Sequence, residues 1–378
     1  MALRILALAT DAYGAGGGIA QYNRDLFQAL AQYGDIDEIV ILPRNGQAPT
    51  QAIPAKVRQL QARPGKIAFT FQALRAMRQR GPFDVIFCGH LFMAPLAILI
   101  SKLTGAPVWL QIHGIEAWQR PSLLQHWAAE RAQLVTAVSR HTRRLFLTWA
   151  SVTPEKVMVL PNTVDERFTP GHKPETLLAR YSLHGKKILL TVSRLAAAER
   201  YKGHDHVIRA MADLRQSHPE IIYVVAGDGD DRPRLERLAG ELDVAEQVRF
   251  IGYVPDSELP DLYRAADVFI MPSTGEGFGI VFLQALASGV PAISGDSDGS
   301  RDPLRDGLNG ELVDATDPSS IKRGILCGLA KPKGIPAGLS NFAWPSFAQR
   351  VVLALQNAAP HLPRMTSHNP HLRDRIVK

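Results

Sequence analysis

The stretch of sequence that decides the fold is Val268-Phe-Ile-Met-Pro-Ser-Thr-Gly-Glu-Gly-Phe-Gly-Ile-Val-Phe-Leu-Gln-Ala-Leu-Ala287. It begins with a short apolar run (268–271), passes through the loop Gly275-Glu276-Gly277-Phe278-Gly279 and ends in a helix-like segment. A strand, a glycine loop and a helix in this order form one βα unit of a parallel sheet. Another apolar run follows at 292–294, so the sequence predicts an α/β fold.

The same alternation of strand-like and helix-like segments extends over the whole 378-residue chain. In the first half we predict strands at 3–10, 38–42, 85–88, 108–112, 134–138 and 157–160, and helices at 19–33, 67–80, 92–103, 123–131 and 140–149. In the second half we predict strands at 188–192, 221–226, 248–251, 268–271 and 292–294, and helices at 204–216, 232–242, 257–265, 279–287, 319–329 and 344–357.

A segment rich in turn formers, 161–174, separates the two halves and contains three prolines. The chain is also too long for one typical domain. We therefore predict two Rossmann-like, doubly wound domains that face a central cleft, at 1–165 and 166–340. A C-terminal helix (341–360) and a polar, mobile tail (361–378) complete the predicted organisation.

Composition excludes several classes of protein. With 46% hydrophobic and 21% charged residues, the chain is neither disordered nor fibrous. Cys88 and Cys327 lie far apart in apolar segments, and we interpret them as buried thiols in a reducing cytosol. The N-terminal run 3–10 is too short for a signal peptide, and the longest apolar stretch, 85–100, is interrupted by polar and helix-breaking residues. The sequence thus predicts a cytoplasmic protein without a spanning helix.

The net charge of +7 is concentrated in the first half. Up to residue 170 there are 18 Lys and Arg against 11 Asp and Glu; the totals of 43 and 36 leave 25 of each for the rest. Docking on anionic lipid would explain this bias, at about 1 kcal/mol per basic residue near the surface. A solvated basic surface is an equally good interpretation. Nucleic acid is disfavoured, because no binding module or aromatic platform accompanies the charges.

Two motifs of the first half follow predicted strands. The loop 11–18 ends in three glycines that would let backbone N–H groups approach an anion, or form only a flexible turn: Gly16, Gly17 and Gly18. Ile19 stands where the dinucleotide fingerprint needs another glycine. His113-Gly-Ile-Glu116 offers an imidazole that could hydrogen-bond or exchange protons with a bound hydroxyl, or could be an ordinary loop histidine. No further zinc ligands occur at suitable spacing, so we predict no metal there.

Two motifs of the second half carry charge at predicted strand ends. Arg194 and Lys202 stand between a strand and a helix, where a guanidinium and an ammonium suit a diphosphate. Gly227-Asp228-Gly229-Asp230 follows the next strand and is either a purely structural turn or part of a ligand site. Turn chemistry explains its carboxylates better than a metal does.

The glycine loop around Glu276 exposes backbone donors and presents one carboxylate to polar ligand groups. Helical spacing would then place Gln284 near the same face, two turns further on.

Together these motifs resemble the retaining glycosyltransferases of family four (glycosyl transferases group 1), which have the GT-B fold. The resemblance covers nearly the whole chain, from the glycine loop 16–18 to the last helix, which in that family crosses back to the first domain. It implies that Arg194 and Lys202 hold a nucleotide-sugar diphosphate, and that Glu276 binds the sugar hydroxyls while His113 lies at the reaction centre. Backbone contacts would come from Gly277, Phe278 and Gly279, and the nucleoside region would include Gly227, Asp228, Tyr253 and Val254.

One position departs from the family pattern. Gln284 stands where the family usually has a second glutamate, thought to bind the ribose. A glutamine keeps one acceptor and two donors but loses the strength of a charge-assisted hydrogen bond, so we expect nucleotide binding to persist but to be weaker. The resemblance further implies front-face substitution in which the cations stabilise the leaving diphosphate, with no cofactor and no metal.

The strings at 113–116, 199–205 and 276–283 look most like bacterial exopolysaccharide α-mannosyltransferases. This resemblance implies transfer of mannose from GDP-mannose to a polyprenyl-diphosphate-linked oligosaccharide, by a protein peripheral on the inner face of the inner membrane. UDP-glucose or UDP-N-acetylglucosamine are alternative donors. A sugar-nucleotide epimerase would need additional acid/base carboxylates, and a non-catalytic nucleotide-binding protein would show Gln284→Glu restoring activity.

Overall fold

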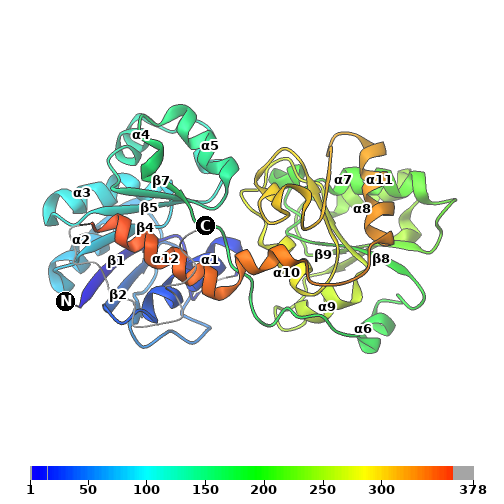
Figure 1. Ribbon diagram of the computed structural model, residues 1–378, viewed down its shortest axis with the longest axis horizontal. Coiled ribbons are helices and arrows are strands. Elements are labelled where there is room, and N and C mark those ends of the chain that lie inside the picture. The colour runs from blue at the N-terminus through cyan, green and yellow to red at the C-terminus, as the bar shows by residue number, and fades with distance from the viewer. Residues whose placement is uncertain (1, 15, 361–378) are drawn as a thin grey trace. The chain divides into compact units, whose positions relative to one another are not determined.

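The computed structural model describes residues 2–14 and 16–360, so the predicted tail at 361–378 lies outside the described residues. The chain divides into two compact units, each built on one parallel sheet (Figure 1). Of the described residues, the first unit contains 2–14, 16–137, 145–160 and 348–360, and the second contains 138–144 and 161–347.

The first unit has a seven-stranded sheet in the order β3-β2-β1-β4-β5-β6-β7, with every neighbouring pair parallel. The strands are β1 (Leu3–Ala9), β2 (Ile36–Pro43), β3 (Val57–Gln59), β4 (Val85–Cys88), β5 (Val108–Ile112), β6 (Leu134–Ala137) and β7 (Val157–Val159). The helices are α1 (Gly18–Ala31), α2 (Lys66–Arg80), α3 (Ala94–Thr104) and α4 (Leu123–Ala129). Helix α5 (Arg140–Trp149) belongs to this unit from residue 145, and α12 (Trp344–Ala358) belongs to it from residue 348.

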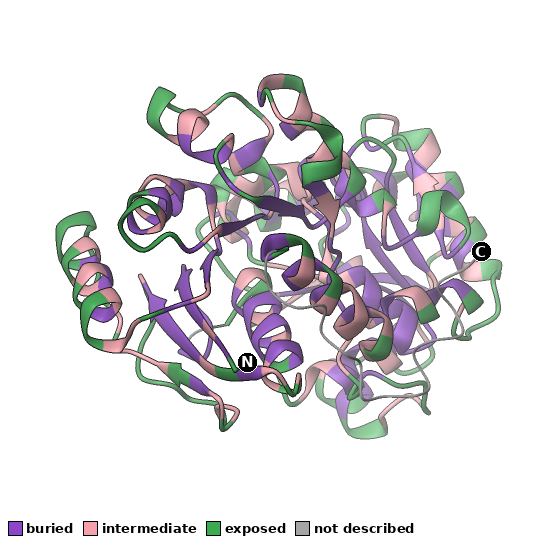
Figure 2. Cartoon of the chain, turned by 60° about the vertical axis from the view of Figure 1, so that its left-hand side comes forward, coloured by how far each residue is buried: buried purple, intermediate pink, exposed green. Residues whose placement is uncertain are grey.

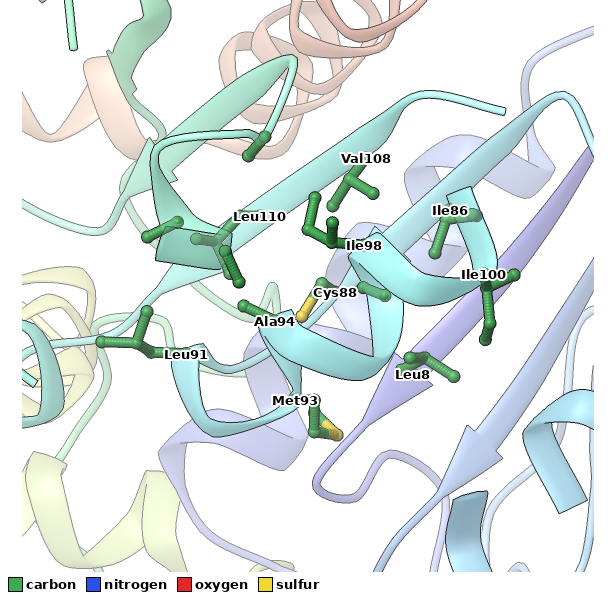
Figure 3. Close-up of a cluster of buried hydrophobic side chains, with 14 of the residues drawn as sticks. Leu8, Ile86, Cys88, Leu91, Met93, Ala94, Ile98, Ile100, Val108 and Leu110 are labelled. Atoms are coloured by element: carbon green, nitrogen blue, oxygen red, sulfur yellow. The ribbon is translucent and has the colours of Figure 1, made fainter. Parts of the chain in front are cut away.

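Alternating side chains of the first sheet pack on its two faces. Ile86 and Cys88 point to one face and join a cluster with buried residues of α2, α3, α4 and α5 (Figure 3). Phe87 points to the other face and meets Phe27 of α1, with ring centroids 5.6 Å apart. Both faces are thereby covered, which explains why the strands are continuous apolar runs rather than alternating ones.

The second unit has a six-stranded parallel sheet in the order β10-β9-β8-β11-β12-β13. Its strands are β8 (Lys187–Val192), β9 (Ile221–Ala226), β10 (Val248–Gly252), β11 (Val268–Met271), β12 (Ala292–Gly295) and β13 (Glu311–Val313). Its helices are α6 (Glu175–Arg180), α7 (His204–Leu214), α8 (Arg232–Glu241), α9 (Leu259–Ala265), α10 (Ile280–Ala287) and α11 (Pro318–Ala330). Helices α7, α8 and α11 cover one face of the sheet, and Phe282 of α10 packs on Phe269 at the other.

The predicted α/β class and the two doubly wound sheets are confirmed, and β4, β5, β9, β11 and α5 have the predicted bounds. The sequence reading missed β3, α6 and β13, which are only three, six and three residues long. The prediction that both thiols are buried is wrong for one of them. Cys88 is buried, and burial raises its pKa to about 12, whereas Cys327 is exposed on the outer side of α11. No described helix is both long and apolar enough to cross a membrane.

Candidate active site

The strand order of the second sheet determines where its functional loops gather. From β8 the chain winds through β9 and β10 on one side, and then returns to build β11, β12 and β13 on the other. The order therefore reverses between β8 and β11. Loops at the carboxyl ends of the two strands beside such a reversal diverge, and ligands of doubly wound sheets bind in the crevice they leave. Arg194 and Lys202 follow β8, and the Glu276 loop follows β11.

The cations and carboxylates of these two loops form one charged cluster. Lys202 Nζ lies 3.0 Å from Glu199 Oε2 and 4.0 Å from Glu276 Oε1, and Arg194 pairs with the other oxygen of Glu199. The side chain of Lys202 is only 11% exposed, whereas that of Arg194 is 78% exposed. An anionic ligand that approached this cluster would compete with Glu199 for both cations.

Burial raises the pKa of Glu276, and the carboxylates of Asp298 and Glu199 raise it further, while the Lys202 ammonium opposes the shift. A carboxyl group whose ionised form is disfavoured gains from polar hydrogens that stabilise its charge. Sugar hydroxyls supply such hydrogens, so the environment of Glu276 suits a polyhydroxylated ligand.

A buried carboxylate on the next loop anchors the Glu276 loop. Asp298, which is 1% exposed and follows β12, accepts hydrogen bonds from the Glu276 N–H at 2.7 Å and the Ser273 hydroxyl at 2.6 Å. Its other oxygen accepts from the N–H and the hydroxyl of Ser300, at 2.9 and 2.5 Å. Asp298 thus joins the loops after β11 and β12, and it holds the Glu276 backbone in a single position.

Close backbone approach packs three loops against one another. A Cβ atom on Gly299 would stand 2.0 Å from the Gly277 carbonyl oxygen, and one on Gly203 would stand 2.3 Å from the Pro272 oxygen. Gly275 lies against the ring of Tyr201, where a Cβ would come within 2.5 Å. These glycines are therefore required by packing, and side chains at their positions would push the loops apart.

The loop after β9 has the same character. Gly227 has φ +131°, and a Cβ there would lie 1.8 Å from the Ser193 oxygen. Asp228 accepts a hydrogen bond from the Gly229 N–H at 2.9 Å within the turn. Asp230 accepts one from the Ala197 N–H at 2.8 Å and so ties this turn to the loop after β8. The structural interpretation of this motif is sufficient to explain its glycines and acids.

The loop after β10 begins at the carboxyl edge of the sheet, as the loops after β8, β9 and β11 do, and it provides an exposed aromatic ring. Tyr253 is 74% exposed, whereas Val254 is buried at 7%. Phe278 is buried as well and meets Phe342 edge-on, with ring centroids 5.8 Å apart. Of these three sequence-predicted residues, only Tyr253 presents a large side chain to solvent.

The spacing argument assumed helical geometry from Glu276 to Gln284, but Glu276 lies outside the helix that contains Gln284. Helix α10 begins at Ile280 because Gly279 adopts a left-handed conformation at φ +83°. The Gln284 carboxamide oxygen accepts a hydrogen bond from the buried Tyr263 hydroxyl at 2.9 Å. Tyr263 thereby orients the amide, which leaves its N–H₂ group as the end that can donate to a ligand.

In the first sheet the strand order reverses between β1 and β4, and the predicted motifs of that half follow β1 and β5. Gly16, Gly17 and Gly18 are exposed at the start of α1, and Gly17 has φ +98°. Among the described residues, no side chain caps this N-terminus, and none of their atoms lies within 4 Å of a Cβ at the three positions, chain neighbours aside. Packing does not require these glycines, unlike those of the second unit.

His113 sits at the end of β5 beside the loop that follows β4. Its Nε2 lies 3.1 Å from the Gly89 carbonyl oxygen, and since a carbonyl only accepts, Nε2 carries the proton and Nδ1 remains an acceptor. Burial and the neighbouring His90 lower the pKa of His113 to about 3. The ring is therefore neutral near pH 7, which favours accepting a hydrogen bond from a ligand hydroxyl over exchanging a proton with it.

This shift predicts how stability depends on pH. Because the pKa of His113 falls from 6.5 to about 3 on folding, the folded protein binds fewer protons, and stability is lost as the pH falls below 6.5. Between pH 7 and 5 we expect His113 to account for about 1–2 kcal/mol of the decrease in the free energy of unfolding. Urea unfolding of His113→Gln should show a flatter pH dependence than the wild type. His172→Gln, at an exposed loop position, is the control; equal slopes for His113→Gln and the wild type would contradict the prediction.

Sequence reasoning assigned no role to Glu199, Asp298 and His90. A carboxylate on a short turn is usually a solvated surface residue, so Glu199 gave no signal of its own. Asp298 did carry one, because the sequence Asp298-Gly-Ser begins four residues after the end of the predicted strand 292–294.

Two family models match this chain, one on each half. Residues 16–168 match the model of glycosyltransferase family 4, and residues 178–333 match that of glycosyl transferases group 1. The chain is 32% identical to the GDP-mannose-dependent alpha-(1-6)-phosphatidylinositol monomannoside mannosyltransferase of Mycolicibacterium smegmatis, covering 74% of this chain and 78% of that protein. It is 28% identical to a D-inositol 3-phosphate glycosyltransferase of Geodermatophilus obscurus, over 93% and 88% of the two chains.

Among solved structures, the Anabaena protein HepE in complex with UDP and glucose is similar to this chain with a TM-score of 0.76 and 20% identity, over 94% of this chain and 99% of that one. The galactosyltransferase WaaB, of the lipopolysaccharide outer core, is similar with a TM-score of 0.73 and 19% identity, over 94% and 99%. These likenesses concern the fold alone. Together with the family models and the mycobacterial relative, they show that this chain belongs to glycosyltransferase family 4, the glycosyl transferases group 1, and has the GT-B fold.

Proposed function

We propose that this glycosyltransferase transfers mannose from GDP-mannose, with retention of the anomeric configuration, to a polyprenyl-diphosphate-linked oligosaccharide in exopolysaccharide synthesis. The observation that supports the donor site best is the cluster of Arg194, Lys202 and Glu276 at the strand reversal of the second sheet. Mannose is favoured because a relative 32% identical to this chain is named as GDP-mannose-dependent.

In the proposed reaction, the bond between the sugar's anomeric carbon and the diphosphate breaks on the same face at which the acceptor oxygen attacks. Lys202 and Arg194 stabilise the negative charge that develops on the diphosphate, while its oxygens take up the acceptor proton. Glu276 binds the sugar hydroxyls, and the backbone from Gly277 to Gly279 contributes N–H donors. This scheme assigns the positive charge to side chains and requires no metal.

The remaining site residues bind or orient parts of the substrates. We assign the Gln284 amide, oriented by Tyr263, to the ribose of the donor and the exposed Tyr253 ring to the nucleoside region, next to Val254, Gly227 and Asp228. In the first unit, the Nδ1 acceptor of His113 suits a substrate hydroxyl. The unpacked glycines 16–18 at the start of α1 suit an anionic group of the acceptor.

A panel of nucleotide sugars tests the proposal. We expect turnover of GDP-mannose, and no more than slow hydrolysis of UDP-glucose or UDP-N-acetylglucosamine, measured by release of the nucleoside diphosphate. Nuclear magnetic resonance of the product should show an α-linked mannose. Turnover with a UDP sugar alone would refute the mannose assignment, and an inverted anomeric centre would refute retention.

A further inference from the structure

Large exposed apolar side chains are unevenly distributed along this chain. Of the eleven that the described residues contain, seven lie between residues 67 and 124: Ile67, Phe71, Leu99, Leu103, Ile115, Leu123 and Leu124. Phe71 is 70% exposed and Leu123 78%. Six of the seven belong to α2, α3 and α4, and such a concentration on three helices is more than the scattered exposure of an ordinary surface.

These three helices form one layer, because all of them contribute buried residues to the cluster on a single face of the first sheet. In α2 the residues that are buried in this cluster are Phe69, Ala73 and Ala76. Phe71 is two residues, or about 200°, from Phe69 and from Ala73, so it points away from the sheet. Figure 2 shows the same two-sidedness, with buried residues on the inner sides of helices and exposed residues on their outer sides.

Helix α3 presents a similar outer side. Leu99, Lys102 and Leu103 are exposed at helical spacing, while Ala97 and Ile98 contact the sheet. The Lys102 ammonium lies 4.8 Å from the centroid of Trp127 of α4, and the Arg131 guanidinium lies 4.4 Å from the same ring. These contacts join the C-terminal end of α3 to α4, and we call the combined outer surface of the three helices the α2–α4 face.

The charges on the α2–α4 face have one sign. Helices α2, α3 and α4 contain five Lys and Arg and no Asp or Glu. In α2, Arg75 and Arg78 continue the exposed row of Ile67 and Phe71 at spacings of four and three residues. Aliphatic and aromatic side chains set among cations on one side of a helix are typical of a surface that lies in a membrane interface.

We propose that the α2–α4 face docks the protein on the surface of an anionic lipid bilayer. The apolar side chains insert at the boundary between headgroups and acyl chains, and the cations bind lipid phosphates. This inference deepens the proposed function and rests on it: docking on a bilayer would bring the enzyme to the lipid-linked acceptor that the proposed function assigns to it.

Two other partners for the α2–α4 face are a second copy of the chain and single-stranded nucleic acid, and both fit it less well than a bilayer does. A second copy of the chain would place cations against cations, which disfavours a dimer through this face. Single-stranded nucleic acid would need stacking platforms, but six of the seven exposed apolar side chains are aliphatic, and only Phe71 carries an aromatic ring.

Vesicle co-sedimentation of the full chain tests the proposal. We expect binding to vesicles of phosphatidylcholine mixed with phosphatidylglycerol, weak binding to phosphatidylcholine alone, and a decrease with salt. The double variants Ile67→Ser/Phe71→Ser and Arg75→Glu/Arg78→Glu should each bind at least about tenfold more weakly. Leu308→Ser and Arg209→Glu/Arg237→Glu, at exposed positions of the second unit, are the matched controls and should bind as the wild type does.

Equal binding to both kinds of vesicle, or unchanged binding by the Arg75→Glu/Arg78→Glu variant, would overturn the proposal. So would a dimer in sedimentation velocity that the apolar variant dissociates. Donor hydrolysis measured without vesicles separates this proposal from the proposed function. A chain that binds vesicles but turns over no donor refutes only the function, and the opposite result refutes only the docking.

Discussion

Lys202→Ala should lower kcat/KM for the donor by about 100- to 1,000-fold, the loss usual for removing one group that stabilises leaving-group charge. The expectation rests on the position of Lys202, whose Nζ lies within 4.0 Å of a carboxylate on each of two loops. Lys202→Arg should restore only part of the activity. The side chain of Lys202 is only 11% exposed, and a planar guanidinium cannot take the place of a compact ammonium there.

Lys202→Ala should also lower the free energy of unfolding, by an amount that depends on pH. Without the ammonium, Glu276 loses the larger of the two positive charges that lower its pKa, and only Arg194 remains, so its pKa rises further. A carboxyl group with a raised pKa binds more protons when folded, so stability falls as the pH rises through that pKa. We therefore expect the destabilisation of Lys202→Ala relative to the wild type, measured by urea unfolding, to grow as the pH rises from about 4.5, the ordinary pKa of a glutamate.

The matched control is Lys187→Ala, which removes an exposed lysine from the amino end of the same strand, β8. It should leave both kinetics and stability as in the wild type. If Lys202→Ala keeps its kcat/KM within twofold of the wild type, the charged cluster does not hold the donor diphosphate.

The second large effect concerns stability. Asp298→Ala should lower the free energy of unfolding by about 3 kcal/mol or more, because buried donors lose their acceptor and each unsatisfied group costs about 1–3 kcal/mol. Those donors are the Ser273 hydroxyl, the Glu276 N–H, and the N–H and hydroxyl of Ser300. The urea midpoint should fall with the m-value unchanged.

Asp296→Ala is the control for that variant, since Asp296 belongs to the same loop but is exposed. It should remain within about 0.5 kcal/mol of the wild type. A loss below about 1 kcal/mol in Asp298→Ala would show that the hydrogen bonds of Asp298 contribute little, and that the Glu276 loop is held by its glycine contacts alone.

The sequence predicted most of the architecture because buried parallel strands are short, uninterrupted apolar runs. Strands such as β5 and β9 therefore have the bounds that hydrophobicity indicated. The edge strands β3 and β13 are three residues long and only partly buried, so their residues carry no such signal. Cys327 was misjudged because Ile325 and Gly328 on either side are buried, although the helix turns the thiol outward.

The site was predictable to the extent that it depends on strand ends. Arg194, Lys202 and Glu276 were expected together, and Lys202 does contact Glu276 through a 4.0 Å ion pair. Glu199, which links Arg194 to Lys202, could not be anticipated, because its role depends on where the turn at 197–202 places its carboxylate. The prediction that helical spacing places Gln284 on the same face as Glu276 was wrong for a related reason. The position of Gln284 depends on the residue at which α10 begins, and spacing along the sequence does not determine that residue.

The glycines at which these loops pack against one another also limit which substitutions the site can accept. Gly203, Gly227 and Gly299 each lie where a Cβ would come within 2.3 Å of a neighbouring backbone oxygen, so the course of the chain around the cluster tolerates no substitution there. New donor preferences must then arise from side chains that replace others on a fixed backbone. Tyr253 is exposed and meets no such restriction, which makes it the position from which directed evolution of this enzyme should begin.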